Sequence, residues 1–330
     1  YFTINRARQY GKTTLLKALA LFLQEEYVVI HLDFQRMSYA DFESEQAFVM
    51  AFASELIDNV VNMPEQIRGR LEEFAEGTAV SLTISTMFRV INKWCRQSEK
   101  RIVLMIDEAD SAANNQVFLD FLAQLRGCYI NRDVKPTFQS VILTGVYDVR
   151  NIKRKIRPEE EHKANSPWNI AAEFSVDMSF SVNDIAGMLM EYEADHKTGM
   201  EVSEIAGLIY EYTSGYPFLV SQLCKLLDER IPDSEHFSGK SDAWTKRGVL
   251  EAVKILLGEP NSLFESLLNK LEDYPELDRM LYDLLFNGKE ITYVVGVHSI
   301  EIALPLPPCS RIKYMMPDCN IRISLFITAS

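Results

Sequence analysis

The sequence lacks any apolar run of the ~18–20 residues that a membrane-spanning helix requires, and no charged-then-apolar signal segment opens it. Cysteine is scarce, and the few cysteines form no C-x-x-C pair, which disfavours a zinc site or a disulfide framework. The five cysteines are Cys95, Cys128, Cys224, Cys309 and Cys319. These absences predict a protein with no membrane partner in a reducing, cytoplasmic compartment. The chain also starts at Tyr1 without Met, which indicates a fragment of a longer protein.

Positive charge is in short supply as well. There are 34 Lys and Arg residues against 47 Asp and Glu residues, and the net charge of -13 disfavours nucleic-acid binding by charge alone. The exception is "DVRNIKRKIR", Asp148–Arg157, where basic residues concentrate. This stretch is either a solvated loop or a local contact site for a nucleic acid or a protein partner.

What the sequence does contain is an alternation of strand and helix patterns in its first half. Short apolar runs typical of buried strands alternate with segments whose apolar residues recur at helical spacing. Such alternation predicts βαβ units and a mostly parallel sheet. The strand-like runs are Tyr1–Asn5, Tyr27–Phe34, Arg101–Asp110, Phe138–Gly145 and, more weakly, Glu173–Met178. The helical runs of this half are Lys12–Glu26, Asp41–Asn62, Ile84–Arg96 and Gln116–Ile130.

The pattern changes near residue 180 and again near residue 290. We therefore expect an α/β domain over 1–180 and a helical domain over 181–290. The helices expected in the second domain are Asn183–Asp195, Val202–Tyr212, Pro217–Arg230, Ala243–Leu257, Leu263–Leu271 and Leu277–Phe286. The tail 291–330 carries four of the twelve prolines and few charges, and its helical periodicity stops. We expect this tail to be either an irregular end or a non-native one, produced by a truncation or a shifted reading frame in the gene.

The segment "NRARQYGKTTLL", Asn5–Leu16, ends like a phosphate-binding loop, whose pattern is G-x-x-x-x-G-K-[ST]. Gly11, Lys12 and Thr13 fit this pattern, whereas Arg6 occupies the first glycine position. A strand-like run precedes the loop and an amphipathic helix opens at Lys12, which is the context that the motif requires.

Each residue type in this loop matches a task in binding a nucleoside triphosphate. Lys12 would reach the β- and γ-phosphates, the Thr13 hydroxyl would ligate Mg²⁺, and Thr14 would lie near the α-phosphate. The missing glycine counts against this interpretation where the turn needs a positive φ. The alternative is that G-K-T only caps a surface helix.

A second half of the site follows the apolar run "IVLMI". Asp107 and Glu108 come directly after it, at the carboxyl end of a strand, where α/β sheets bind ligands. Asp107 would hold Mg²⁺ through water, and Glu108 would act as the general base toward the attacking water. The alternative is that D-E-x-D is an ordinary polar loop start.

Thr144 ends the strand-like run "VILTG". We expect this strand to lie between the loop strand and the acidic strand, so that Thr144 can touch the γ-phosphate or the lytic water. The alternative is an ordinary strand-ending threonine.

Taken together, "NRARQYGKTTLL", "VLMIDEAD", "VILTG" and "TSGYPFLVSQLC" resemble the AAA-like ATPases, in the AAA+/STAND branch of phosphate-loop NTPases. In this group the loop reads R-x-R-x-[FY]-G-K-[ST] and lacks the first glycine. The resemblance implies an α/β P-loop NTPase fold of ASCE/AAA+ type, a parallel-sheet three-layer sandwich followed by an all-α lid. It also implies ATP and Mg²⁺ as cofactors. The nucleotide-binding residues carried over are Arg8, Gln9, Tyr10, Gly11, Lys12, Thr13 and Thr14.

The resemblance extends to "GYP", Gly215–Pro217, which matches a G-x-P motif at the start of a helix. Pro217 is expected at the first helical position, where its missing N–H is not needed. The resemblance implies that this helix start contacts the nucleotide and reports its state to the lid. The alternative is an ordinary start of a core helix.

These motifs predict an ATP-binding protein whose Mg-dependent hydrolysis drives movement of the helical domain. One alternative is a nucleotide-gated switch or scaffold with little turnover, presenting the helical domain to a partner. Another is the ATPase of a DNA-processing or mobile-element system, based on the basic stretch Asp148–Arg157. In a homo-oligomer, Arg150, Arg154 or Arg157 could serve as an arginine finger for a neighbour's nucleotide.

Overall fold

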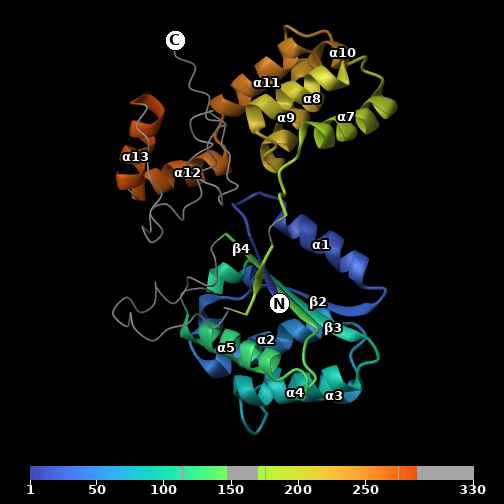
Figure 1. Ribbon diagram of the computed structural model, residues 1–330, viewed down its shortest axis with the longest axis vertical. Helices are drawn as coiled ribbons and strands as arrows, with labels where there is room; N and C mark the ends of the chain where they lie inside the picture. Colours follow the sequence, from blue (N-terminus) through green and yellow to red (C-terminus); the bar gives the residue numbers. More distant parts are fainter. Residues whose placement is uncertain (113–114, 147–169, 175, 274, 288–330) are drawn as a thin grey trace. The chain divides into compact units, whose positions relative to one another are not determined.

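The computed structural model describes residues 1–112, 115–146, 170–174, 176–273 and 275–287 of the chain (Figure 1). The chain forms two compact units. The first comprises Tyr1–Ala7 and Lys12–Ser175, and the second comprises Arg8–Gly11 and Val176–Ser330. Four residues of the first loop therefore group with the second unit.

The first unit contains a five-stranded parallel sheet in the order β2-β3-β4-β1-β5. The strands are β1 (Phe2–Asn5), β2 (Tyr27–Asp33), β3 (Arg101–Asp107), β4 (Ser140–Gly145) and β5 (Ala172–Glu173). The expected position of β4, between the loop strand β1 and the acidic strand β3, is confirmed. Because all strands run in one direction, the carboxyl ends of β1, β3 and β4 meet at the same edge of the sheet.

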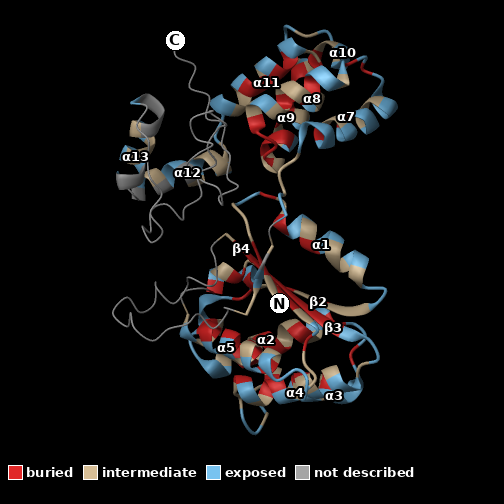
Figure 2. Ribbon diagram, viewed as in Figure 1, coloured by how far each residue is buried: buried red, intermediate tan, exposed pale blue. Residues whose placement is uncertain are grey.

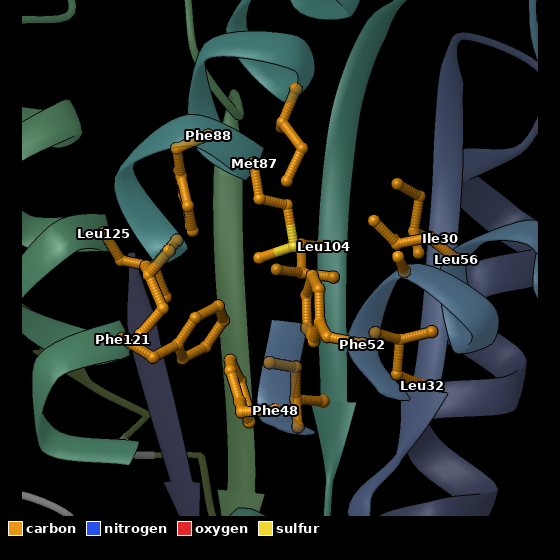
Figure 3. Packing of buried hydrophobic residues seen from close by; sticks show 14 of the residues in the cluster. Ile30, Leu32, Phe48, Phe52, Leu56, Met87, Phe88, Leu104, Phe121 and Leu125 are labelled. Carbon is orange, nitrogen blue, oxygen red and sulfur yellow. The ribbon is translucent and has the colours of Figure 1, made fainter. Parts of the chain in front are cut away.

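Helices cover both faces of this sheet. The first-unit helices are α1 (Lys12–Leu23), α2 (Glu45–Asn59), α3 (Glu65–Ala75), α4 (Ile84–Gln97) and α5 (Gln116–Ile130). Leu104 and Ile106 pack with α2, α4 and α5 in one core cluster, in which Phe48 and Phe121 lie 5.3 Å apart between ring centroids (Figure 3). The alternate residue Met105 is fully buried outside that cluster, on the face that α1 covers. The predicted three-layer arrangement is thereby confirmed.

Two helical predictions for this unit differ from the structure. The helix expected from Asp41 starts at Glu45, because the Ser44 hydroxyl accepts a hydrogen bond from the Ala47 amide and caps it there. The helix α3 was not expected. Five of its eleven residues are charged, and its buried residues are Ile67, Leu71 and Phe74.

The second unit is helical over its described residues. Its helices are α7 (Val182–His196), α8 (Val202–Thr213), α9 (Pro217–Glu229), α10 (Lys240–Ala243), α11 (Lys246–Gly258), α12 (Ser262–Asp273) and α13 (Pro275–Phe286). Buried residues of α8, α9 and α11 form a core that also includes Trp244 (Figure 2). The helix expected over Ala243–Leu257 begins at Lys246 instead, because Thr245 caps it by accepting from the Gly248 amide.

The turn between α8 and α9 requires glycine. Gly215 has a φ of +74°, in the left-handed region that residues with a side chain rarely adopt. A Cβ added to Gly215 would lie 1.9 Å from the carbonyl oxygen of Phe180. The Phe180 amide in turn donates to the Gly215 carbonyl at 2.9 Å. Backbone therefore packs against backbone at this turn, and neither segment can shift without a large cost in free energy.

We predict that Gly215→Ala lowers the free energy of unfolding of the second unit by roughly 3 kcal/mol or more, through left-handed strain and the clash with Phe180. Gly207 within α8 is a matched control, because a Cβ there meets nothing within 4 Å. Gly207→Ala should stabilise the helix by about 0.5–1 kcal/mol. Denaturant unfolding of both variants measures the difference, and equal effects would contradict the prediction.

Candidate functional site

The turn from β1 into α1 explains how the loop can lack its first glycine. Arg6 is not among the described residues with a positive φ, so this position uses a backbone conformation that any residue can adopt. Its amide donates to the Gly145 carbonyl at 3.2 Å, which extends the pairing of β1 with β4. The left-handed positions of the loop are Gln9, with φ 57°, and Gly11, with φ 79°.

Lys12, the first residue of α1, is 5% exposed. Its ammonium donates to the carbonyl oxygens of Arg6 and Ala7, each at 3.2 Å. The positive charge therefore lies against the first part of the loop that precedes it. Ionised phosphate oxygens are stronger acceptors than these neutral carbonyls, so an anion placed here would compete well for the ammonium.

Asp107, the last residue of β3, connects three segments of the first unit. Its carboxylate accepts a hydrogen bond from the Thr13 hydroxyl at 2.5 Å and another from the Thr144 hydroxyl. It also accepts from the amide of Glu108 at 3.0 Å. The structure thus brings Thr13, Asp107 and Thr144 together, at the start of α1 and the ends of β3 and β4.

Glu108 follows Asp107 in a left-handed conformation, with φ 50°. For a residue with a side chain this costs of order 1 kcal/mol, and such residues cluster at functional sites. Two hydrogen bonds hold the turn: the Glu108 amide donates to Asp107, and its carbonyl accepts from Ser111 at 3.0 Å. The turn directs the chain from β3 into the short 3₁₀ helix Ala109–Ala112.

Asp110 also lies at this edge of the sheet. It is the last residue of the D-E-x-D motif, but no contact was predicted for it. One of its oxygens accepts from the Val146 amide at 3.0 Å. Among the described residues, its other oxygen is buried without a hydrogen-bond partner. A Cβ on Gly145 would lie 2.7 Å from that oxygen, so Asp110 occupies the space that the glycine leaves. The ends of β3 and β4 are therefore joined twice.

The remaining predicted site residues lie in several places. Thr14 is exposed in the first turn of α1. The loop tip Arg8–Gly11 belongs to the second unit, where Pro217 is the first residue of α9 as expected. Arg150 and Arg154, together with the whole stretch Asp148–Arg157, lie outside the described residues.

In the described parts of the chain, no group of three or more His, Cys, Asp or Glu side chains could hold a metal ion by itself. Within the same residues, no helix combines the length and the apolar character that crossing a membrane requires.

The sheet order, the loop that opens α1 at a lysine, and the acidic end of the neighbouring strand define a P-loop NTPase domain. The AAA-like domain family matches residues 1–248, and the chain belongs to this family. The predicted resemblance to AAA-like ATPases is thereby confirmed. The narrower assignment to the STAND branch stays a prediction.

One solved structure agrees with this fold. The Walker-type ATPase of Pyrococcus abyssi is similar at 17% identity and a TM-score of 0.50, over 84% of this chain and 72% of that protein. The ORC2 protein of Aeropyrum pernix, solved with ADPNP and ADP, matches at 12% identity and a TM-score of 0.44, over 77% of this chain and 60% of its own. No curated protein sequence matches this chain.

We predict that Thr144→Val lowers the free energy of unfolding by about 1.5–3 kcal/mol, because it removes a hydrogen bond to the buried carboxylate of Asp107 without changing side-chain shape. Thr144→Ser keeps the hydroxyl and should lose less than half as much. Denaturant unfolding measures both. A larger loss in Thr144→Ser than in Thr144→Val would contradict the prediction, because it would show that the methyl group of Thr144, and not its hydroxyl, provides the stability.

Proposed function

We propose that this protein binds Mg-ATP at the carboxyl edge of its sheet and hydrolyses it. Its family membership and P-loop fold support nucleotide binding. The observation that carries the proposal is the carboxylate of Asp107, which accepts from both Thr13 and Thr144. One acid thereby ties the lysine-bearing helix start to both neighbouring strand ends.

The residues at this edge fit Mg²⁺ and a triphosphate. The Thr13 hydroxyl and the Asp107 carboxylate are oxygen ligands of the kind that Mg²⁺ prefers, and they lie within 2.5 Å of each other. Thr13 would ligate the ion directly and Asp107 through water. When bound, Mg²⁺ supplies neutralisation of the phosphate charge.

The start of α1 would hold the phosphates. The first turn of a helix presents amide N–H groups that no helical carbonyl occupies, and its dipole favours negative charge. Lys12 would exchange the Arg6 and Ala7 carbonyls for the β- and γ-phosphates. Arg8, Gln9, Tyr10 and Gly11 would complete the loop around them.

Glu108 is the proposed general base. Its peptide bond to Asp107 places it at the same edge of the sheet, and its left-handed turn fixes where its side chain departs. It would accept a proton from the attacking water, while Thr144 would orient that water or the γ-phosphate. Transfer of the γ-phosphoryl group to water then gives ADP and phosphate.

The proposed output is movement of the helical unit. The peptide bond between Gly11 and Lys12 joins the loop tip of the second unit to α1 of the first. A nucleotide that reshapes the loop would therefore act on both units, and Pro217 would report its state through α9.

The alternatives are a nucleotide-gated switch with little turnover and a DNA-processing ATPase. The latter depends on Asp148–Arg157, as does an arginine finger from Arg150 or Arg154 in a homo-oligomer.

We predict that Lys12→Ala raises the dissociation constant for ATP by more than about 30-fold, because it removes the ammonium that contacts the Arg6 and Ala7 carbonyls, a loss of ~2 kcal/mol or more. Lys17→Ala removes an exposed lysine from the same helix and serves as control, with affinity unchanged. Calorimetric titration with ATP and Mg²⁺ measures both. Equal affinity of the two variants would refute the proposed phosphate site.

We predict that Glu108→Gln retains ATP affinity within about threefold but lowers turnover by ~10²–10⁴-fold, the usual contribution of a general base. Phosphate release under single-turnover conditions measures the rate. A loss below tenfold would exclude Glu108 as the base. A wild-type protein that binds ATP without turnover would instead support the switch.

A further inference from the structure

The tip of the loop, Arg8–Gly11, is held by side chains of the second unit, to which it belongs. The Tyr216 hydroxyl donates a hydrogen bond to the Arg8 carbonyl. The Tyr10 ring packs edge-on against the Tyr216 ring, with centroids 4.7 Å apart and planes at 74°. The Tyr10 hydroxyl lies 2.5 Å from the hydroxyl of Ser179. Two aromatic side chains thus anchor a four-residue segment.

Both tyrosines are fixed by their surroundings. Tyr10 is 4% exposed and Tyr216 is 1% exposed. Tyr216 is the N-cap residue of α9, and its backbone donates to Thr213 and accepts from Val220, both at 3.0 Å. Burial, with a smaller contribution from Tyr10, raises the pKa of Tyr216 above its usual range, so its hydroxyl keeps the proton that it donates.

The hydrogen bond from Tyr216 orients the whole peptide group between Arg8 and Gln9, and not the Arg8 carbonyl alone. A trans peptide is planar, with its C=O and N–H pointing in opposite directions. Fixing the Arg8 carbonyl therefore also fixes the direction of the Gln9 amide. Gln9 is the non-glycine residue of the loop in the left-handed region, with φ 57°. Its side-chain amide also donates to the Ser262 hydroxyl at 2.9 Å. Without such partners in the second unit, a residue with a side chain would leave that region readily.

We propose that Tyr216 and Tyr10 are positioning residues for the phosphate-binding loop. Tyr216 turns the Arg8 carbonyl toward the helical unit and so leaves the Gln9 amide facing away from it, available to an anion. Tyr10 braces the Tyr216 ring and secures the tip through Ser179. This inference rests on the proposed function for its ligand, ATP, but the anchoring itself does not depend on that function.

Limited digestion with trypsin at the Arg8–Gln9 bond tests the anchoring without nucleotide, because Arg8 is exposed and cleavage tracks local opening. Tyr216→Phe keeps the ring and removes the donor. We expect the cleavage rate to rise about fivefold, as ~1 kcal/mol of lost hydrogen-bond free energy gives. Calorimetric titration of the same variant should show a dissociation constant for ATP raised by a similar factor.

Tyr192→Phe is the matched control, because it removes a tyrosine hydroxyl that donates to Asp228 in the same unit. It should leave both cleavage at Arg8 and ATP affinity unchanged within twofold, even where its global stability falls as far as that of Tyr216→Phe. Tyr10→Phe and Ser179→Ala should each raise cleavage, and the double variant should raise it no further, since one interaction is lost in all three.

The outcomes separate the two proposals. Unchanged cleavage in Tyr216→Phe, or an equal rise in Tyr192→Phe, would overturn the anchoring. A raised cleavage rate with unchanged ATP affinity would overturn the positioning role. Failure of the wild-type protein to bind ATP would refute the proposed function, and with it the assignment of ATP as the ligand of the anchored loop.

Discussion

The arrangement of this site depends on one buried carboxylate. Asp107 is 3% exposed, and an ionised carboxylate at such a position is costly unless hydrogen bonds replace the lost water. The hydroxyls of Thr13 and Thr144 and the amide of Glu108 provide those hydrogen bonds. Each donor comes from a different feature: the start of α1, the end of β4 and the turn after β3. Satisfying the acid therefore fixes the geometry of all three.

That convergence follows from strand order, which is why much of it could be predicted. Apolar runs followed by Asp107 and Thr144 indicate parallel strands with polar ends, and β4 lies between β1 and β3 as expected. Long helices with periodic apolar residues could also be predicted from the sequence, and α5 spans the expected Gln116–Ile130. These features are encoded locally, by the alternation of apolar and polar residues and by the side chains that start each helix.

What the sequence did not reveal depends on backbone angles and distant partners. The left-handed turn at Glu108 could not be predicted from the sequence, because glutamate does not favour that conformation and the pattern of apolar residues does not report backbone angles. The contact between Asp110 and Val146 spans 36 positions, and that between Tyr216 and Arg8 spans 208. The helix α3 was not predicted for a different reason. Its three buried residues, in a segment rich in charge, form too weak a periodic signal.

The loop shows why a motif is a statement about conformation as well as chemistry. The first glycine of the pattern is dispensable here because Arg6 keeps a negative φ and pairs with Gly145 along the strand edge. The left-handed conformation falls on Gln9 and Gly11 instead. Gly11 adopts it without strain, whereas Gln9 does so next to a peptide whose carbonyl is bonded to Tyr216. A tertiary contact from the helical unit thus adjoins the one loop residue that is left-handed despite carrying a side chain, and the conformation of the loop depends on that unit as well as on the loop's own sequence.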